Sequence, residues 1–147
     1  MIQYIPMNET HVPQIAELEK LCFSDPWSER SVASELKSSY SYWLVAFDGD
    51  RVAGYVGSQT SIDESDMMNI AVHPDYRRMG VAQGLVAALC RGLATKGIHA
   101  ISLEVRVSNE PARALYEKLG FVQVGCRPNY YRNPKEDALI LRKEWEL

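Results

Sequence analysis

The sequence lacks the features that mark membrane, secreted and nucleic-acid-binding proteins. Its 147 residues contain no apolar run near the ~20 residues that cross a bilayer. The opening residues, MIQYIPMNET, carry no basic segment followed by an apolar one, so we expect no secretory signal. Asp and Glu (19) outnumber Lys and Arg (16), and the net charge of −3 argues against bulk nucleic-acid binding. These absences favour a cytoplasmic protein.

Cysteine and histidine are also scarce, with three of each. The cysteines are Cys22, Cys90 and Cys126. Their odd number and wide spacing, without a CxxC pair, indicate reduced thiols rather than a disulfide framework. The histidines are His11, His73 and His99. They have no spacing typical of a metal site, so we expect them at the surface or at strand ends, and we expect no bound metal.

The residues that are present favour a single globular domain over 1–147. Hydrophobic residues make up 46% and charged residues 24% of the chain, which is ordinary for a folded protein. Periodicity and turn residues predict helices at 8–22, 28–36, 80–96 and 109–119. They predict strands at 42–47, 51–59, 67–72, 98–105, 121–126 and 138–141, with loops at 61–66 and 127–137. This order indicates an α/β (α+β) fold with a mixed sheet covered by helices.

The segment RRMGVA, residues 77–82, is suited to binding a phosphate group. It opens a predicted helix, whose first amides have no internal partner and favour an anion. Gly80 allows the backbone to approach a ligand closely, and Ala82 is too small to obstruct it. Arg77 and Arg78 would add positive charge, although an ordinary loop with two solvated arginines would show the same pattern. The spacing matches neither a P-loop nor a GxGxxG fingerprint.

Two further residues have both a chemical and a structural interpretation. Glu104 lies where an apolar strand ends, either on the polar side of the sheet or as a general base beside a ligand crevice. Tyr116 lies in the middle of the helix predicted at 109–119, next to its apolar stripe. Packing is the more common role for a tyrosine at such a position.

The segments NIAVHPDYRRMGVAQGL and LEVRVSNEPARALYEKLGF resemble the GCN5-related N-acetyltransferase (GNAT) superfamily, and the resemblance covers nearly the whole chain. It implies the GNAT fold, a mixed and mostly antiparallel sheet flanked by about four helices, with acetyl-CoA as co-substrate. In that family the RRxGxA turn holds the pyrophosphate through backbone amides, and the strand before it pairs with the pantetheine arm. The implied cofactor contacts are Ile70, Ala71, Val72, Arg77, Arg78, Met79, Gly80, Val81, Ala82 and Asn109.

Within the superfamily, LEVRxSN, ALYxKxGF and RxxYY…EDA look most like the bacterial ribosomal-protein N-terminal alanine acetyltransferases. This resemblance implies direct attack on acetyl-CoA by a protein's N-terminal amine, that of alanine on a small-subunit ribosomal protein. Glu104 is then the general base and Tyr116 the general acid. Tyr130 and Tyr131, in the predicted loop 127–137, would hold the acceptor's backbone.

For three further features we expect a structural role or none at the site. Glu136 and Asp137 are expected to form a solvated turn. The segment 23–28 resembles the family's other wall of the peptide entrance, although we expect Trp27 to be a core residue. Nothing in the sequence demands an oligomer, and a monomer is the default expectation.

Two alternatives keep part of this interpretation. The acceptor could be a small amine such as a polyamine, an amino sugar or an amino acid. A polyamine would be favoured if Asp63, Glu64 and Asp66 folded over the crevice. The chain could also be an acyl-CoA-binding module without catalysis, although the presence of both Glu104 and Tyr116 argues against that.

Overall fold

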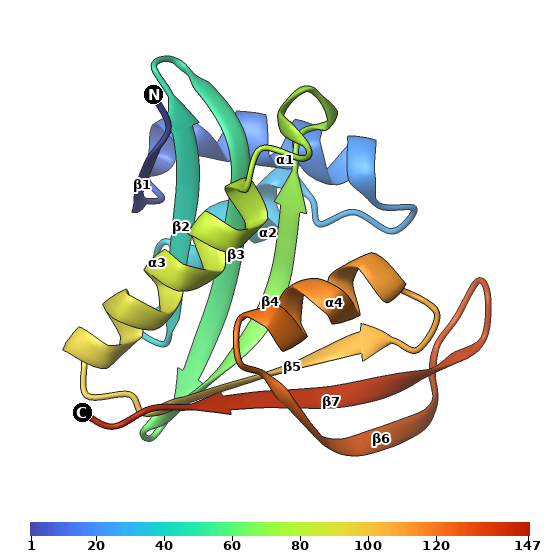
Figure 1. Ribbon diagram of the computed structural model, residues 1–147. Helices are drawn as coiled ribbons and strands as arrows, with labels where there is room; N and C mark the ends of the chain where they lie inside the picture. Colours follow the sequence, from blue (N-terminus) through green and yellow to red (C-terminus); the bar gives the residue numbers. More distant parts are fainter.

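A seven-stranded sheet organises the chain, which the computed structural model describes from residue 1 to residue 147 (Figure 1). The strands are β1 Gln3–Pro6, β2 Ser41–Asp48, β3 Arg51–Ser61, β4 Glu64–Val72, β5 Ala100–Arg106, β6 Val122–Tyr131 and β7 Glu136–Glu144. Their order in the sheet is β1-β2-β3-β4-β5-β7-β6. Only the pair β4–β5 is parallel. The prediction of a mixed, mostly antiparallel sheet is therefore confirmed.

Four α-helices and two short 3-10 turns complete the fold. The helices are α1 Val12–Cys22, α2 Glu29–Glu35, α3 Val81–Thr95 and α4 Glu110–Lys118, and the turns are η1 Glu9–His11 and η2 Pro74–Tyr76. The predicted N-caps are confirmed, because Ser28 and Asn109 each accept a hydrogen bond from a backbone amide of the helix that follows. Gly97 and Gly120, just beyond α3 and α4, have φ of +80° and +94°, as predicted for residues that end helices.

Five of the six predicted strands were too short, the one at 98–105 began two residues early, and one strand was missed. Residues 3–6 form β1 on β2, and the predicted loop 61–66 contains only a two-residue turn between β3 and β4. The predicted loop 127–137 is mostly strand, because β6 continues to Tyr131 and β7 begins at Glu136. Hairpin pairing holds these polar residues in strands. Side-chain periodicity is a weak signal for them, since β6 is an edge strand exposed along most of its length.

Helices cover both faces of the sheet and divide the core in two. In Figure 1, α3 crosses one face of the sheet while α1 and α2 lie behind it. Nineteen buried residues pack on one face, and they include the buried residues of α3 and Tyr116 of α4. Ten buried residues pack between the other face and the helices α1 and α2. The strand β3 is therefore buried on both sides, which explains its nearly continuous run of small and apolar residues.

The strands β4 and β5 form a short parallel pair and then separate. Their pairing covers only Glu64–Asp66 against Ala100–Ser102. Beyond these residues the two strands point apart, as Figure 1 shows. On its other side, β4 stays paired with β3 as far as Val72, with a register shift after Gly57. The second half of β4 therefore has one paired edge and one open edge.

One histidine prediction is wrong. His11 is buried, with 3% of its surface exposed, and its Nδ1 accepts a hydrogen bond from Asn8 N at 3.0 Å. It completes a capping box at η1, and burial lowers the pKa of its imidazole. His73 and His99 lie partly exposed next to strand ends, as predicted.

All three cysteines are free, as predicted. None of the helices combines the length and the apolar character needed to span a membrane.

Candidate active site

A cavity of about 1110 Å³ opens where β4 and β5 separate. Its wall comes from the second half of β4, the end of β5, α4, the end of β6 and the segment after α1. The predicted site residues in this wall are Ile70, Ala71, Val72, Arg77, Ala82, Glu104, Asn109, Tyr116, Tyr130 and Tyr131. The structure thus brings together residues that lie far apart in the sequence. Four predicted site residues lie outside the wall: Arg78, Met79 and Gly80 in the turn that leads into α3, and Val81 as the first residue of that helix.

This turn has an unusual backbone. Arg78 and Gly80 have φ of +62° and +74°, in the left-handed region. Gly80 is the N-cap of α3 and supplies no side-chain hydrogen bond, so the first amides of the helix lack a capping partner. A Cβ on Gly80 would meet no protein atom within 4 Å, so within the protein it is the left-handed conformation that favours glycine here. Val81 is 2% exposed and packs into the core, which leaves only its backbone for a ligand.

Arg77 is exposed in the cavity wall and is bonded to the end of β4. Its Nε donates to the carbonyl oxygen of Val72 at 3.3 Å, and its Nη2 lies 3.7 Å from the sulfur of Cys22. These contacts direct its positive charge to the place where β4 ends and the turn before α3 begins.

The open edge of β4 supplies backbone groups to the cavity. Ile70, Ala71 and Val72 pair with β3 on one side. On the other side, pairing with β5 ends at Asp66. An extended ligand lying in the gap could therefore bond to this edge as an additional strand would.

Glu104 faces the cavity, and its side chain is 30% exposed. The strand β5 presents it there, paired with Ile140 of β7 on the far side from β4. Its Oε1 lies 3.3 Å from Nε of Arg127. Tyr131 lines the same cavity, and burial, followed by the negative charge of Glu104, raises the pKa of its phenol to about 12.

Tyr116 is both a packed residue and part of the cavity wall. It is 5% exposed, and its ring meets that of Phe121 edge-on, with the centroids 5.4 Å apart. Its hydroxyl donates to the thioether sulfur of Met67 at 3.8 Å, a weak acceptor. Burial raises the pKa of this phenol to about 12, so it stays protonated throughout the neutral range.

Tyr130 and Tyr131 end β6 instead of lying in a loop. Their rings meet edge-on with the centroids 5.0 Å apart. The guanidinium of Arg106 lies 4.4 Å from the centroid of the Tyr131 ring, and that of Arg127 lies 5.9 Å from the Tyr130 ring. Both rings are thus supported by cations, an arrangement that stabilises exposed aromatic side chains.

The expectation of a solvated turn at Glu136 and Asp137 is wrong. The side chain of Glu136 is 18% exposed, and it accepts hydrogen bonds from Ser108 N at 2.6 Å and from Arg106 Nη1 at 3.2 Å. Asp137 accepts from Asn129 N at 2.8 Å. Arg106 also donates to two backbone carbonyls of the β6–β7 turn. Together these contacts clamp the tip of the hairpin to the end of β5.

The acidic residues at 63–66 do not fold over the cavity. They lie at the closed end of the β4–β5 pair, and none of them is in the cavity wall. Glu64 is bound by Arg142, and Asp63 lies 3.4 Å from His99. Asp63, Glu64 and His99 do come within 4.8 Å of one another, a grouping of potential metal ligands that histidine spacing could not indicate, because they come from different elements.

The sequence interpretation missed one buried acid in the cavity wall. Glu19 is 1% exposed and is bonded to Trp27 N and to the side chain of Asn69. Its position did carry a signal, since it follows Ile15 by four residues on the apolar face of α1. Trp27 packs on Trp43, with the centroids 5.4 Å apart, and also lines the cavity.

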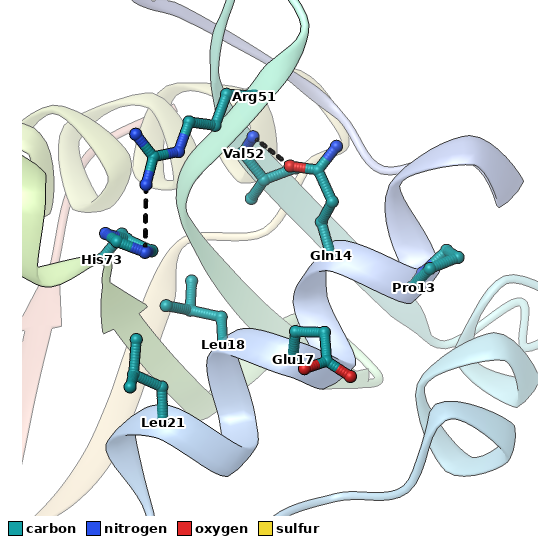
Figure 2. A pocket seen from close by; sticks show the side chains of 8 residues that line it. All are labelled: Pro13, Gln14, Glu17, Leu18, Leu21, Arg51, Val52 and His73. Carbon is teal, nitrogen blue, oxygen red and sulfur yellow. Dashed lines mark hydrogen bonds between the residues drawn. The ribbon is translucent and has the colours of Figure 1, made fainter.

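A second cavity, of about 420 Å³, lies between α1 and the start of β3 (Figure 2). Gln14 accepts a hydrogen bond from Val52 N at 2.8 Å, and Arg51 approaches His73 at 3.2 Å, as the dashed lines in Figure 2 show. This cavity shares no lining residue with the larger one and contains none of the predicted site residues.

Comparison with known proteins agrees with this geometry. Residues 12–121 match the Acetyltransferase (GNAT) family. The chain is 36% identical over 137 residues to the ribosomal protein bS18-alanine N-acetyltransferase of Escherichia coli strain K12, covering 92% of each protein. It is 34% identical over 142 residues to the enzyme of that name from Haemophilus ducreyi, covering 92% of this chain and 97% of the other.

Solved structures show the same likeness. The crystal structure of the ribosomal-protein-S18-alanine N-acetyltransferase from Escherichia coli matches with a TM-score of 0.91 and 33% identity, covering 100% of this chain and 96% of the other. A chain of the NatC complex bound to Gag peptide and CoA matches with a TM-score of 0.85 and 25% identity, covering 99% of each. From its sequence match, its fold and the cavity between β4 and β5, the chain belongs to the GNAT family of N-acetyltransferases, enzymes that use acetyl-CoA.

Proposed function

We propose that this chain acetylates the N-terminal amine of a protein, and that the acceptor is the N-terminal alanine of ribosomal protein bS18. The observation that carries the proposal is a single cavity that joins the open edge of β4, Glu104, Tyr116 and the tyrosine pair of β6. Relatives at 34–36% identity over 92% of the chain are named for that acceptor.

The proposed acetyl-CoA site follows β4 into the start of α3. Backbone groups of Ile70, Ala71 and Val72 on the open edge would pair with the pantetheine arm. The free amides at the start of α3, with Arg77 and Arg78, would bind the pyrophosphate. Asn109 lies in the same cavity wall at the start of α4. The residues present fit this co-substrate, which supplies the acetyl group as a thioester.

Glu104 is the proposed general base. An α-amine has a reference pKa of about 7.7–8.0, so deprotonation at pH 7 costs about 1–1.4 kcal/mol, against roughly 4–5 kcal/mol for a lysine near 10.4. A carboxylate on the cavity wall is sufficient for the first task. Glu104 would accept the proton of the arriving ammonium group, and the neutral amine would attack the thioester carbonyl directly.

Tyr116 is the proposed general acid. Its phenol is protonated at neutral pH, and its hydroxyl contacts only a weakly accepting sulfur in the structure. It can therefore donate to the departing thiolate sulfur as the carbon–sulfur bond breaks, when negative charge develops on that sulfur. Tyr130 and Tyr131, supported by Arg127 and Arg106, would hold the first peptide groups of the acceptor.

The test is a comparison of acceptors by initial rate. We expect a short peptide with the N-terminal sequence of bS18 to be acetylated with a kcat/KM at least tenfold above spermidine, an amino sugar or a free amino acid. Glu104→Gln should lower kcat about 10²–10⁴-fold, because it removes the base. Glu110→Gln, at the exposed start of α4, is the control and should leave kcat unchanged.

Each alternative has its own outcome in this assay. A polyamine or another small amine as the best acceptor would overturn the proposed substrate. Acetyl-CoA binding without turnover of any amine would favour the non-catalytic module. Full activity of Glu104→Gln would remove that residue from catalysis.

A further inference from the structure

Glu19 is the one carboxylate among the buried residues, and the proposed mechanism does not use it. It is 1% exposed and lies in the cavity wall. Its Oε1 accepts from Trp27 N at 2.9 Å, and its Oε2 accepts from Asn69 Nδ2 at 2.6 Å. No Lys, Arg or His lies within ion-pair distance. Burial raises the pKa of this carboxyl, and the two hydrogen bonds partly offset the shift.

The two partners of Glu19 belong to different walls of the cavity. Trp27 ends the segment 23–27, which lines the cavity through Phe23, Ser24, Asp25 and Trp27. Asn69 lies on β4, immediately after the register shift and within the part of the strand whose other edge is open. One side chain on α1 thus joins a loop to the strand beside it.

A closed set of contacts surrounds this link. Trp27 packs on Trp43, and Trp43 stacks on Tyr55 with the centroids 5.7 Å apart and the rings 9° from parallel. The Tyr55 hydroxyl lies 3.5 Å from Nδ2 of Asn69, and Asn69 in turn donates to Glu19, so the contacts form a ring. The aromatic contacts bring the Trp27 side chain to the sheet, whereas Glu19 alone holds its backbone to β4.

A buried carboxylate without a cation lowers the stability of a fold, because two hydrogen bonds offset its desolvation only in part. A positioning role accounts for it. A carboxylate accepts at both oxygens, whereas an amide accepts at one only, and both partners here are donors.

We infer that Glu19 is a positioning residue of the acceptor site, which sets the distance between the segment 23–27 and β4 by binding Trp27 N with one oxygen and Asn69 with the other. This inference rests on the proposed function, since it assigns the space between these walls to the acceptor peptide. The proposed acetyl-CoA contacts of β4 lie beyond Asn69 and pair with β3, and Oδ1 of Asn69 also accepts a hydrogen bond from Ile70 N at 3.2 Å.

The first test is Glu19→Gln, which keeps the size of the side chain and the acceptor for Trp27 N but places an amide against Asn69. We expect the KM for the acceptor peptide to rise about tenfold, since a hydrogen bond to a charged group is lost. The kcat and the KM for acetyl-CoA should change less than about twofold. Glu17→Gln is the matched control, because that residue is exposed on the same helix and lies outside this cavity.

The second test reverses the link. In the double variant Glu19→Gln with Asn69→Asp, the new amide donates to the new carboxylate while still accepting from Trp27 N. We expect the acceptor KM to return to within about threefold of the unaltered protein. Asn69→Asp alone places two carboxylates against each other and should raise the acceptor KM more than Glu19→Gln does. If a substitution only destabilised the protein, a smaller fraction of the enzyme would be active. The apparent kcat would then fall, and the KM for the acceptor would not change.

Hydrogen exchange of the backbone amides of 23–28 separates this inference from the proposed function. We expect faster exchange at Trp27 in Glu19→Gln and recovery in the double variant. An unchanged acceptor KM in Glu19→Gln, or no recovery in the double variant, would overturn the inference while leaving N-terminal acetylation in place. If the unaltered chain acetylates no N-terminal peptide, the proposed function fails. Hydrogen exchange still tests the link in that case, because an exchange rate of the Trp27 amide that is unchanged in Glu19→Gln would overturn it.

Discussion

Tyr116 shows how a residue can pack in the core and still be available for chemistry. Its ring packs against Phe121, the residue lines the cavity, and its hydroxyl has the thioether of Met67 as its partner. Because burial disfavours the phenolate, the raised pKa keeps the proton on the oxygen until a stronger acceptor arrives. The packing and catalytic interpretations of Tyr116 are therefore compatible.

This arrangement predicts the pH dependence of kcat. Because the pKa of Tyr116 is about 12, the phenol does not ionise at working pH, and kcat should not fall between about pH 7 and pH 9. Tyr116→Phe should lower kcat about 10²-fold with little change in unfolding temperature, and Tyr40→Phe, at an exposed residue, should have no effect. A loss of kcat with an apparent pKa near 8 or 9 that disappears in Tyr116→Phe would contradict this role.

Gly80 has a conformational reason for being glycine, in addition to the close approach of a ligand that the sequence predicts. Its φ is positive, and no protein atom lies within 4 Å of the place a Cβ would take. We expect Gly80→Ala to cost about 1–2 kcal/mol of unfolding free energy, since an L residue is strained in this region. The KM for acetyl-CoA should also rise, because the amides of the turn would shift.

Gly49 provides a matched control for this change. It also has a positive φ, +70°, with nothing within 4 Å of a Cβ, but it lies in the turn between β2 and β3. Gly49→Ala should lower the unfolding free energy by a similar amount, measured by urea denaturation, and leave the KM for acetyl-CoA unchanged. Equal KM values in both variants would argue against a cofactor role for the turn.

At the scale of elements, the tip of the β6–β7 hairpin is held by charged groups, whereas β7 is packed in the core. The edge strand β6 is mostly exposed, and the tip of the hairpin is held by Arg106 and Glu136. Hydrogen bonds from Ser108, and then Arg106, lower the pKa of the Glu136 carboxyl. A lowered pKa in the folded protein means that the stabilisation is complete above the ordinary carboxyl pKa and is lost as the pH falls through the lowered value.

The clamp therefore predicts a stability difference that depends on pH. Glu136→Gln should unfold at a lower urea concentration than the unaltered protein at pH 7, and this difference should shrink as the pH falls below about 4, because the carboxyl becomes protonated in both states. Glu146→Gln, near the exposed C-terminal end, should match the unaltered protein at every pH. A difference that grew on acidification would show that the sign of the pKa shift is wrong.

The elements that sequence patterns predicted well are those with strong local signals. The helices α3 and α4 begin and end close to the predicted residues because caps and glycines mark their ends. Strand β6 was underestimated because pairing with β7, rather than a buried face, holds it, and the first half of β4 was underestimated because residues 61–66 are mostly polar. The tyrosine pair was consequently assigned to a loop, although its place at the site was anticipated.

At the scale of the whole molecule, the site results from one irregularity of the sheet. The strands β4 and β5 separate after three paired residues, and the gap receives side chains from α1, α4 and β6. No local pattern predicts that separation. Glu104 was a candidate base from its place at a strand end, and the family resemblance assigned the roles of Glu104 and Tyr116, whereas Glu19 and the Arg106 clamp became visible only with the fold. The net charge of −3 is not the relevant scale for an anionic co-substrate, since helix amides and two arginines determine the local field at the turn.

The central claim is that this cavity delivers an α-amine, and not another amine, to acetyl-CoA. The most direct measurement is to incubate a peptide that begins with alanine and contains an internal lysine with the enzyme and acetyl-CoA, and then to locate the acetyl group by fragmentation mass spectrometry. The account predicts a single acetyl group on the alanine nitrogen, with Glu104→Gln giving far less of the same product. Acetylation of the lysine side chain by the unaltered enzyme, with the alanine nitrogen left free, would contradict it.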